Sequence, residues 1–184
     1  MATIRNGNKS VLLVVDVQVD VMKDGWDAPR VIANIAHAVE RARVRGVPVL
    51  WVQHENADMP YDSPGWQWVP ELVPAAGEVR LFKKYSSSFE ETSLERELDR
   101  LGASHIVLAG AQSNWCIRAT AYGALDRGYD LTLVEDGHTT DSMTREDGTV
   151  IEARGIVDDL NLAMTWLAYP GRKTRIAKAA ELEF

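Results

Sequence analysis

The sequence has little cysteine, no basic cluster and no long hydrophobic run, and each of these shortages excludes a class of protein. Cys116 is the only cysteine in 184 residues, so no disulfide forms within the chain. The formal net charge is −7 and no basic run is longer than the pair Lys83 and Lys84, which gives no electrostatic footprint for a nucleic-acid backbone. No stretch approaches the roughly 20 apolar residues of a membrane span. We therefore expect neither a nucleic-acid nor a membrane partner.

The N-terminal segment carries an apolar run of only about six residues, which is too short for a signal peptide. A lone thiol that stays reduced is typical of an intracellular protein, so a cytoplasmic location is expected. A chain of this size buries roughly 70% of the surface of its unfolded form and needs no disulfide or structural metal. Because no linker or repeat interrupts it, we expect a single domain over residues 1–184.

Apolar runs rich in β-branched residues alternate with segments of helical period. This alternation is typical of a three-layer α/β/α fold, in which helices cover both faces of a parallel sheet. The strands are expected at residues 10–16, 47–53, 79–82, 105–110, 130–136 and 174–177.

Residues typical of helix starts and helix ends mark several helices between these strands. Gly46 ends a helix whose apolar residues are spaced three and four apart. Thr92 and Glu95 fit a capping box at the start of another helix, and Gly102 follows its end. Two further helices are expected at about 114–127 and about 144–168. The long proline-containing stretch at 55–77 is predicted to be a lid or binding loop.

Four side chains that could take part in catalysis follow predicted strands: Asp16, His54, Lys83 and Cys116. Ligands of open parallel sheets bind outside the carboxyl ends of the strands, so these side chains mark a candidate site. A lone cysteine is more often a packed small side chain. In the first turn of a helix, however, the positive end of the helix dipole favours thiolate. Asp16 is suitable as a proton acceptor and Lys83 as an orienting cation. The alternatives are that Asp16 is a cap or turn residue at the strand end and that Lys83 is a solvated surface charge.

Three segments then resemble the motifs of the isochorismatase-like cysteine hydrolases, which include nicotinamidases, N-carbamoyl amidases and isochorismatase. VVDVQ at 14–18 resembles the D-x-Q motif, and FKKYSSSFEETSL at 82–94 resembles the K-x5-F segment with its T-x-L. GAQSNWCIRATAYGALDRGYDLTLVED at 110–136 resembles the segment that carries the cysteine. The similarity covers about 9–166, and it implies a six-stranded parallel sheet in the order 3-2-1-4-5-6.

The resemblance also implies roles for individual residues. Cys116 is the expected nucleophile, Asp16 the general base and Lys83 the cation that holds it. Lys83 is preferred to Lys84 because it lies six residues before Phe89, as in the family motif.

The loop after the fourth strand carries a non-prolyl cis peptide in this family, which implies one between Gln112 and Ser113. The family loop aims the backbone N–H groups of Gln112 and Cys116 at the substrate carbonyl oxygen. The residues expected to bind substrate are Gln18, His54, Ser113 and Trp115.

Departures from the family motifs narrow the expected chemistry. His54 is the only histidine after the second strand, and with Glu55 and Asp58 it falls short of a metal-ligand set, so no metal is expected. No phosphate-binding or serine-hydrolase motif is present, so no cofactor is expected either. Val21 replaces an aromatic residue of the pocket wall. The candidates to replace it are Trp26, Trp66, Trp68, Tyr85 and Trp115.

Together these features predict a hydrolase that cleaves a small amide-like C–N bond through a thioester intermediate. Two alternatives stay open: a vinyl-ether or ester hydrolase on the same scaffold, and a non-catalytic protein that binds small molecules. The resemblance and the six tryptophans favour a homo-oligomer, a dimer or tetramer.

Overall fold

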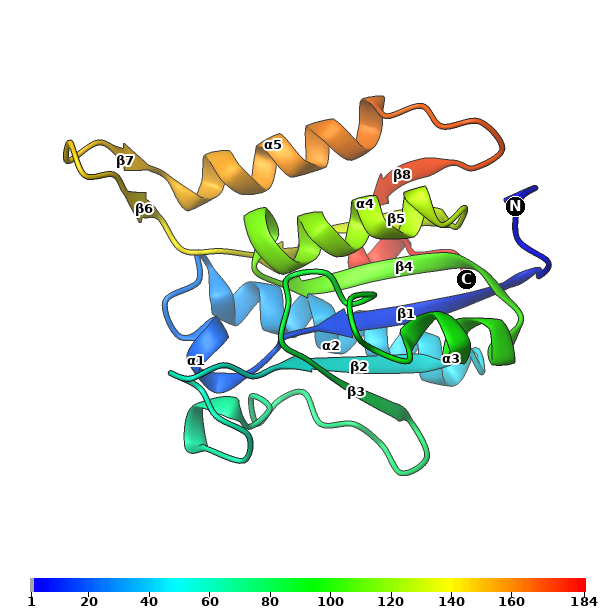
Figure 1. The fold of residues 1–184 in the computed structure, drawn as a ribbon, viewed down its shortest axis with the longest axis horizontal. Helices are drawn as coiled ribbons and strands as arrows, with labels where there is room; N and C mark the ends of the chain where they lie inside the picture. Colours follow the sequence, from blue (N-terminus) through cyan, green and yellow to red (C-terminus); the bar gives the residue numbers. More distant parts are fainter. Residues whose placement is uncertain (1) are drawn as a thin grey trace.

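A six-stranded parallel sheet forms the centre of the computed structural model, which describes residues 2–184 (Figure 1). Every pair of neighbouring strands is parallel. In spatial order the strands are β3 (Val79–Lys83), β2 (Val49–His54), β1 (Lys9–Val15), β4 (Ala103–Ala111), β5 (Asp130–Thr139) and β8 (Thr174–Ala177). The predicted order is confirmed, with β8 as the sixth strand.

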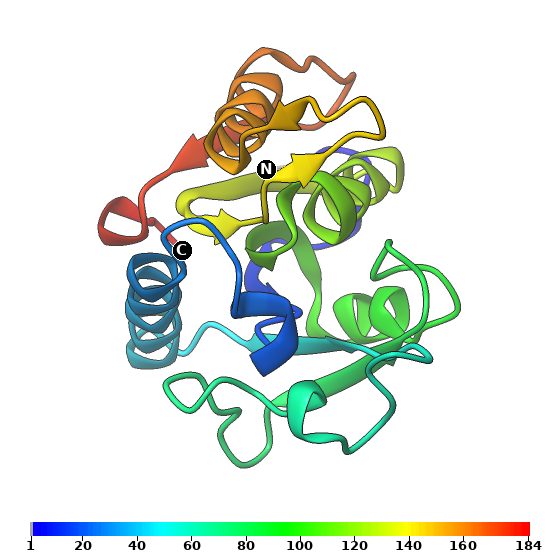
Figure 2. The ribbon, with the colours of Figure 1, turned by 90° about the vertical axis from the view of Figure 1, so that its left-hand side faces the viewer.

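Helices cover both faces of this sheet, as Figure 2 shows from the edge that holds the carboxyl ends of the strands. The long helix α2 (Ala28–Val44) lies on one face, near the short helix α1 (Val19–Met22). Three helices pack on the other face: α3 (Leu94–Leu101), α4 (Arg118–Asp126) and α5 (Ala153–Trp166). Short 3-10 turns occur at Pro64–Trp66 and Ala179–Glu181. No helix in residues 2–184 is long and apolar enough to cross a membrane.

The central strand β1 joins two hydrophobic cores because its side chains alternate between the faces of the sheet. Leu13 and Val15 pack in the core beneath α3, α4 and α5, whereas Leu12 and Val14 pack beneath α2. All four are fully buried. Burying such a side chain stabilises the fold by roughly 1.5–3 kcal/mol, so β1 is firmly anchored just before Asp16.

The start of α3 differs from the predicted capping box. The N-cap is Ser93, without a side-chain cap. Thr92 instead donates from Oγ1 to the Ser88 carbonyl (2.6 Å) and accepts from the Leu94 N–H (3.2 Å). Its hydroxyl therefore ties the preceding turn to the helix. Gly102 ends α3 in the left-handed region, as expected.

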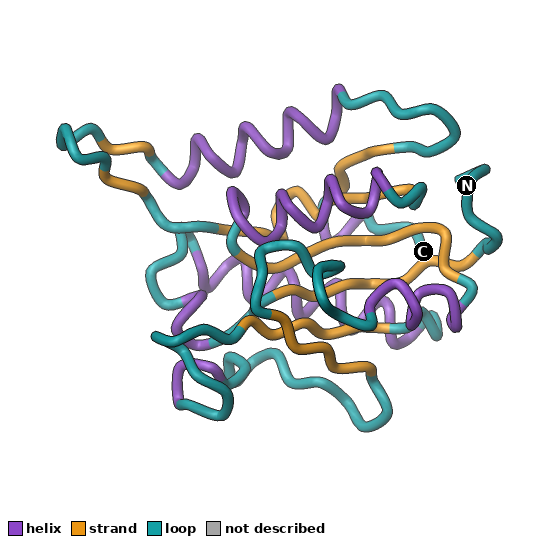
Figure 3. The backbone as a smooth tube through the Cα atoms, in the orientation of Figure 1, coloured by secondary structure: helices purple, strands orange, loops and turns teal. Residues whose placement is uncertain are grey.

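The helix expected from about 144 is wrong over its first part. An antiparallel hairpin of β6 (Met143–Thr144) and β7 (Val150–Ile151) extends beyond the sheet there (Figures 1 and 3). Gly148 adopts φ +82°, a left-handed conformation that favours a turn over a helix. The Arg145 N–H donates to the Thr149 carbonyl across this turn (2.9 Å).

Candidate active site

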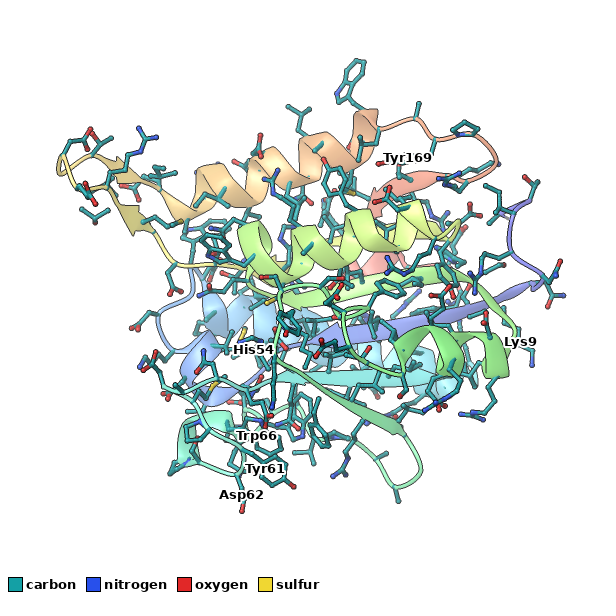
Figure 4. The ribbon with its side chains drawn as sticks, in the orientation of Figure 1. Lys9, His54, Tyr61, Asp62, Trp66 and Tyr169 are labelled. Carbon is teal, nitrogen blue, oxygen red and sulfur yellow. The ribbon has the colours of Figure 1, made fainter. Side chains whose placement is uncertain are left out.

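The predicted catalytic side chains meet at the carboxyl edge of the sheet. Asp16 follows β1, Lys83 ends β3, and Cys116 lies between β4 and α4. His54 ends β2, and Figure 4 places it near the end of that strand, apart from Tyr61 and Trp66 in the following loop. A pocket of about 480 Å³ opens against Asp16, His54 and Cys116. The chain thus brings together residues that lie 100 positions apart.

The backbone turns sharply where β1 ends. Asp16 adopts φ +55°, a conformation that short polar residues tolerate better than other side chains. Its N–H donates to the Val52 carbonyl (2.8 Å). The neighbouring Gly110 has φ +130°, and a Cβ there would lie 1.9 Å from the Val15 carbonyl oxygen. A glycine is therefore required for β1 and β4 to approach beside the site.

Lys83 is the centre of the site. Its Nζ lies 2.7 Å from Asp16 Oδ2, 3.1 Å from Cys116 Sγ and 3.2 Å from the Tyr85 carbonyl oxygen. Burial alone would lower the pKa of Lys83, but the facing Asp16 and Cys116 outweigh it and raise the pKa above its ordinary value. Lys84 instead extends into solvent and pairs with Glu55 at 3.5 Å. These contacts favour Lys83 over Lys84 as the catalytic cation.

Cys116 lies on the π-helical turn Ser113–Ile117, which leads into α4. Burial and the negative charge of Asp16 raise the pKa of the Cys116 thiol to about 12, against the opposing effect of Lys83. This direction is opposite to the one expected from the start of a helix. Desolvation and the facing carboxylate favour the thiol form of Cys116.

The non-prolyl cis peptide joins Ala111 to Gln112 rather than Gln112 to Ser113, one bond earlier than predicted. The Gln112 carbonyl accepts from the N–H groups of Trp115 and Ile117, both at 3.1 Å. The Gln112–Ser113 peptide is thereby part of the helical turn, which explains why the cis bond does not lie there.

Of the residues expected to bind substrate, His54 and Trp115 line the pocket, whereas Gln18 and Ser113 do not. Gln18 is fully buried and bonds to the backbone of His54. Ser113 is also fully buried, with Oγ 2.8 Å from His138 Nδ1. These two assignments are corrected: both side chains hold neighbouring segments in place.

Among the aromatic candidates for the pocket wall, only Trp115 lines this pocket within the described chain. Trp66 packs on Tyr61 with ring centroids 4.7 Å apart, and Trp68 packs on Trp51 at 5.3 Å. Both rings therefore pack against other aromatic side chains instead of lining the pocket.

Several pocket residues were not predicted individually. Asp20 and Lys23 come from the segment around α1, and Asn56 and Met59 from the loop that was predicted to bind substrate. Gln112 was expected to act through its backbone, but its side chain also lines the pocket and donates to Asp141 Oδ2 (3.0 Å). The loop could be found from its length and composition, whereas the individual residues carry no spacing signal.

Asp16, His54 and Cys116 also form a group of metal-ligand types, with ligand atoms within 4.8 Å of one another. The Lys83 ammonium lies within hydrogen-bond distance of all three, 3.2 Å from His54 Nδ1. A divalent cation at their centre would have to displace this buried charge. The cluster therefore does not fit a resident metal ion.

Comparison with known proteins assigns the chain to a family. The Isochorismatase domain family matches residues 10–156. The chain belongs to the isochorismatase family. It is 34% identical to a streptothricin hydrolase of Streptomyces noursei over 70% of this chain and 54% of that one, so it spans about half of that relative. It is 30% identical to the maleamate amidohydrolase of Pseudomonas putida over 71% of this chain and 72% of that one.

A crystal structure of an isochorismatase from Pseudomonas putida KT2440 shares the fold. The TM-score is 0.82 at 28% identity, covering 95% of this chain and 91% of that one. The predicted isochorismatase-like fold and the hydrolase class are therefore confirmed.

Proposed function

We propose that this isochorismatase-family hydrolase cleaves a small amide-like C–N bond through a thioester on Cys116. The observation that carries the proposal is the buried Lys83 ammonium, which contacts Asp16 Oδ2 and Cys116 Sγ, and both of these residues line an open pocket. Such a trio supplies a nucleophile, a proton acceptor and a charge that orients both.

Asp16 has one oxygen free for proton transfer. Oδ2 is held by Lys83, whereas Oδ1 is buried without a hydrogen-bond partner among residues 2–184. A buried acceptor without a partner is costly. Accepting the Cys116 thiol proton relieves that cost, so Oδ1 is the proposed general base.

The reaction then proceeds in two halves. As the thiol proton moves to Asp16, Sγ forms a bond to the carbonyl carbon and the oxygen takes up negative charge, which the N–H groups of Gln112 and Cys116 are proposed to stabilise. The C–N bond breaks, and the leaving nitrogen takes the proton from Asp16. Water next adds to the thioester, giving a proton to Asp16. The acid is released, and Cys116 regains its proton.

The raised pKa of the Cys116 thiol makes proton transfer part of the attack. Because the raised pKa disfavours a free thiolate, Asp16 is proposed to take the proton in the same step as the attack. The names of the streptothricin hydrolase and the maleamate amidohydrolase support a hydrolytic reaction, the latter at an amide. Vinyl-ether or ester hydrolysis and simple binding are the alternatives.

A screen of small amides, ureas and carbamoyl compounds for released ammonia tests the proposal. With a substrate found, Cys116→Ala should reduce kcat by about 10³-fold or more while thermal unfolding stays close to the wild type. Lys84→Ala serves as the control, because Lys84 extends into solvent. Intact-protein mass spectrometry should detect an acyl group on Cys116. Turnover that survives Cys116→Ala would favour protonation of a vinyl ether instead.

A further inference from the structure

Hydrogen bonds hold both the backbone and the ring of His54 in place. Its N–H donates to Gln18 Oε1 (2.8 Å), and Gln18 Nε2 donates back to the His54 carbonyl (3.0 Å). The Gln18 side chain is fully buried and donates also to the Trp66 carbonyl (3.0 Å). The backbone of His54 is therefore fixed from both sides.

The imidazole ring is fixed as well. Lys83 Nζ lies 3.2 Å from His54 Nδ1, and a lysine ammonium only donates hydrogen bonds. A proton on Nδ1 would point at this cation, so in the neutral ring the proton resides on Nε2. Lys83 stays charged because it is buried against Asp16. The salt bridge thereby sets the tautomer of His54.

The protonated Nε2 has no acceptor among the residues that the structure describes. Within residues 2–184, Lys83 is the one group that forms a hydrogen bond with the His54 ring. The ring lines the same pocket as Cys116, and one of its nitrogens lies within 4.8 Å of the thiol sulfur. A ring with an unused donor therefore stands beside the nucleophile.

We propose that His54 Nε2–H binds a second acceptor oxygen of the substrate, a carbonyl, hydroxyl or ether placed close to the scissile carbonyl. The inference rests on the proposed function, because the scissile carbonyl oxygen itself is assigned to the N–H groups of Gln112 and Cys116. It narrows the substrate class to small amides with such an oxygen. An aliphatic amide would cover this donor without offering it an acceptor, which costs binding energy.

A role for His54 as a base is disfavoured by the charges around it. Burial and Lys83 lower the pKa of His54, against the weaker opposing effects of Asp16 and Glu55. To accept a proton, the ring would also have to surrender its bond with Lys83. The neutral donor form is thus maintained at neutral pH.

Aldehydes test the inference without a known substrate, since they form reversible hemithioacetals with a catalytic thiol. The probes are methoxyacetaldehyde and 3-methoxypropanal, each paired with its hydrocarbon isostere, butanal and pentanal. Their affinities follow from protection of Cys116, the only cysteine, against iodoacetamide. Two variants dissect the ring: His54→Gln keeps a donor near the place of Nε2, whereas His54→Asn keeps an acceptor toward Lys83 but has no atom at Nε2.

We expect His54→Asn to lower the ether-to-hydrocarbon affinity ratio about fivefold, the loss of one modest hydrogen bond, and His54→Gln to retain most of it. An unchanged ratio in His54→Asn, or an equal loss in both variants, would overturn the inference and leave the proposed function intact. Absence of protection by all four aldehydes would contradict the proposed nucleophile, and the inference with it. If a variant does not fold, ring ¹⁵N spectra of the wild type decide: a proton on Nδ1 overturns the assignment.

Discussion

Lys83 Nζ and Asp16 Oδ2 lie 2.7 Å apart, and the two side chains retain 0% and 1% of their solvent exposure. Desolvating both charges costs more than a surface pair ever would, so a buried ion pair is a weak source of stability. Apolar side chains of similar volume would stabilise the fold as well or better. The pair is therefore explained by the chemistry of the adjacent thiol, whose sulfur lies 3.1 Å from the same ammonium.

Asp16→Asn should separate thiol reactivity from turnover. The Asp16 carboxylate raises the pKa of Cys116, and Lys83 opposes it. Removing the negative charge leaves Lys83 free to stabilise a thiolate, so alkylation by iodoacetamide at pH 7 should become faster, by about 10-fold for each pKa unit recovered. Amide turnover should nevertheless fall by at least about 10²-fold, because the general base is lost.

Rates of alkylation and of ammonia release, measured on the same preparation, check this dissociation. Asp126→Asn is the control, because Asp126 is exposed at the end of α4 and does not line the pocket. Parallel slowing of both reactions in Asp16→Asn would mean that Asp16 activates the thiol toward every electrophile, contrary to the expectation.

Lys83→Met should destabilise the fold and stop turnover. It leaves the Asp16 carboxylate buried without its counter-ion, which costs about 3–5 kcal/mol in free energy of unfolding. Adding Asp16→Asn should restore much of that stability, because the uncompensated charge is then gone. Lys84→Met, at the exposed neighbouring position, should change stability by less than about 0.5 kcal/mol. Urea denaturation gives all four values, and equal losses at positions 83 and 84 would refute the assignment.

The sheet could be predicted from the sequence because its signals are local. The buried strands are continuous β-branched runs, and the short β8 occurs at 174–177 as expected. The hairpin around Gly148 could not be predicted in the same way. Its strands are exposed and two residues long, so neither a buried stripe nor an alternating pattern marks them. What determines them is a turn conformation rather than burial.

The features of the site also divide into those that the sequence predicts and those that depend on three-dimensional contacts. Asp16, Lys83 and Cys116 were found because parallel strands deliver their carboxyl ends to one edge. The direction of the Cys116 pKa shift was missed, because it depends on how deeply the thiol is buried and on the Asp16 carboxylate beside it. The true task of Gln18 was missed for a similar reason: its partners are backbone atoms of His54, and no sequence spacing encodes them.

Gly110→Ala should damage both stability and catalysis. The added Cβ would lie 1.9 Å from the Val15 carbonyl oxygen, at a φ of +130° that side chains rarely adopt. Relief requires β4 to move away from β1 immediately before Asp16, at a cost of about 3 kcal/mol or more. Gly46→Ala is the control, because nothing lies within 4 Å of its added Cβ at φ +67°. That variant should lose only about 1–2 kcal/mol. Thermal unfolding of both variants tests the difference, and equal losses would contradict it.

Stability should also fall below neutral pH, because the fold holds His138 neutral. Complete burial lowers the pKa of His138 to about 4, and the ring is hydrogen-bonded between Ser113 and Asn161. The unfolded chain takes up a proton near pH 6.5, the ordinary value, whereas the folded protein does not until about pH 4. This contribution is present in full above pH 6.5 and is lost as the pH falls, by about 2 kcal/mol at pH 5.

His138→Gln should therefore flatten the pH dependence of the unfolding free energy between about pH 7 and pH 5 by about 0.7 proton. Only the slope is compared, since the substitution also alters packing. His37→Gln, at an exposed position of α2, should leave the slope unchanged. Part of the slope should persist in His138→Gln, because burial also lowers the pKa of His105 to about 4. Urea denaturation at several pH values measures the slopes, and identical slopes for His138→Gln and the wild type would show that the ring is protonated in the folded state.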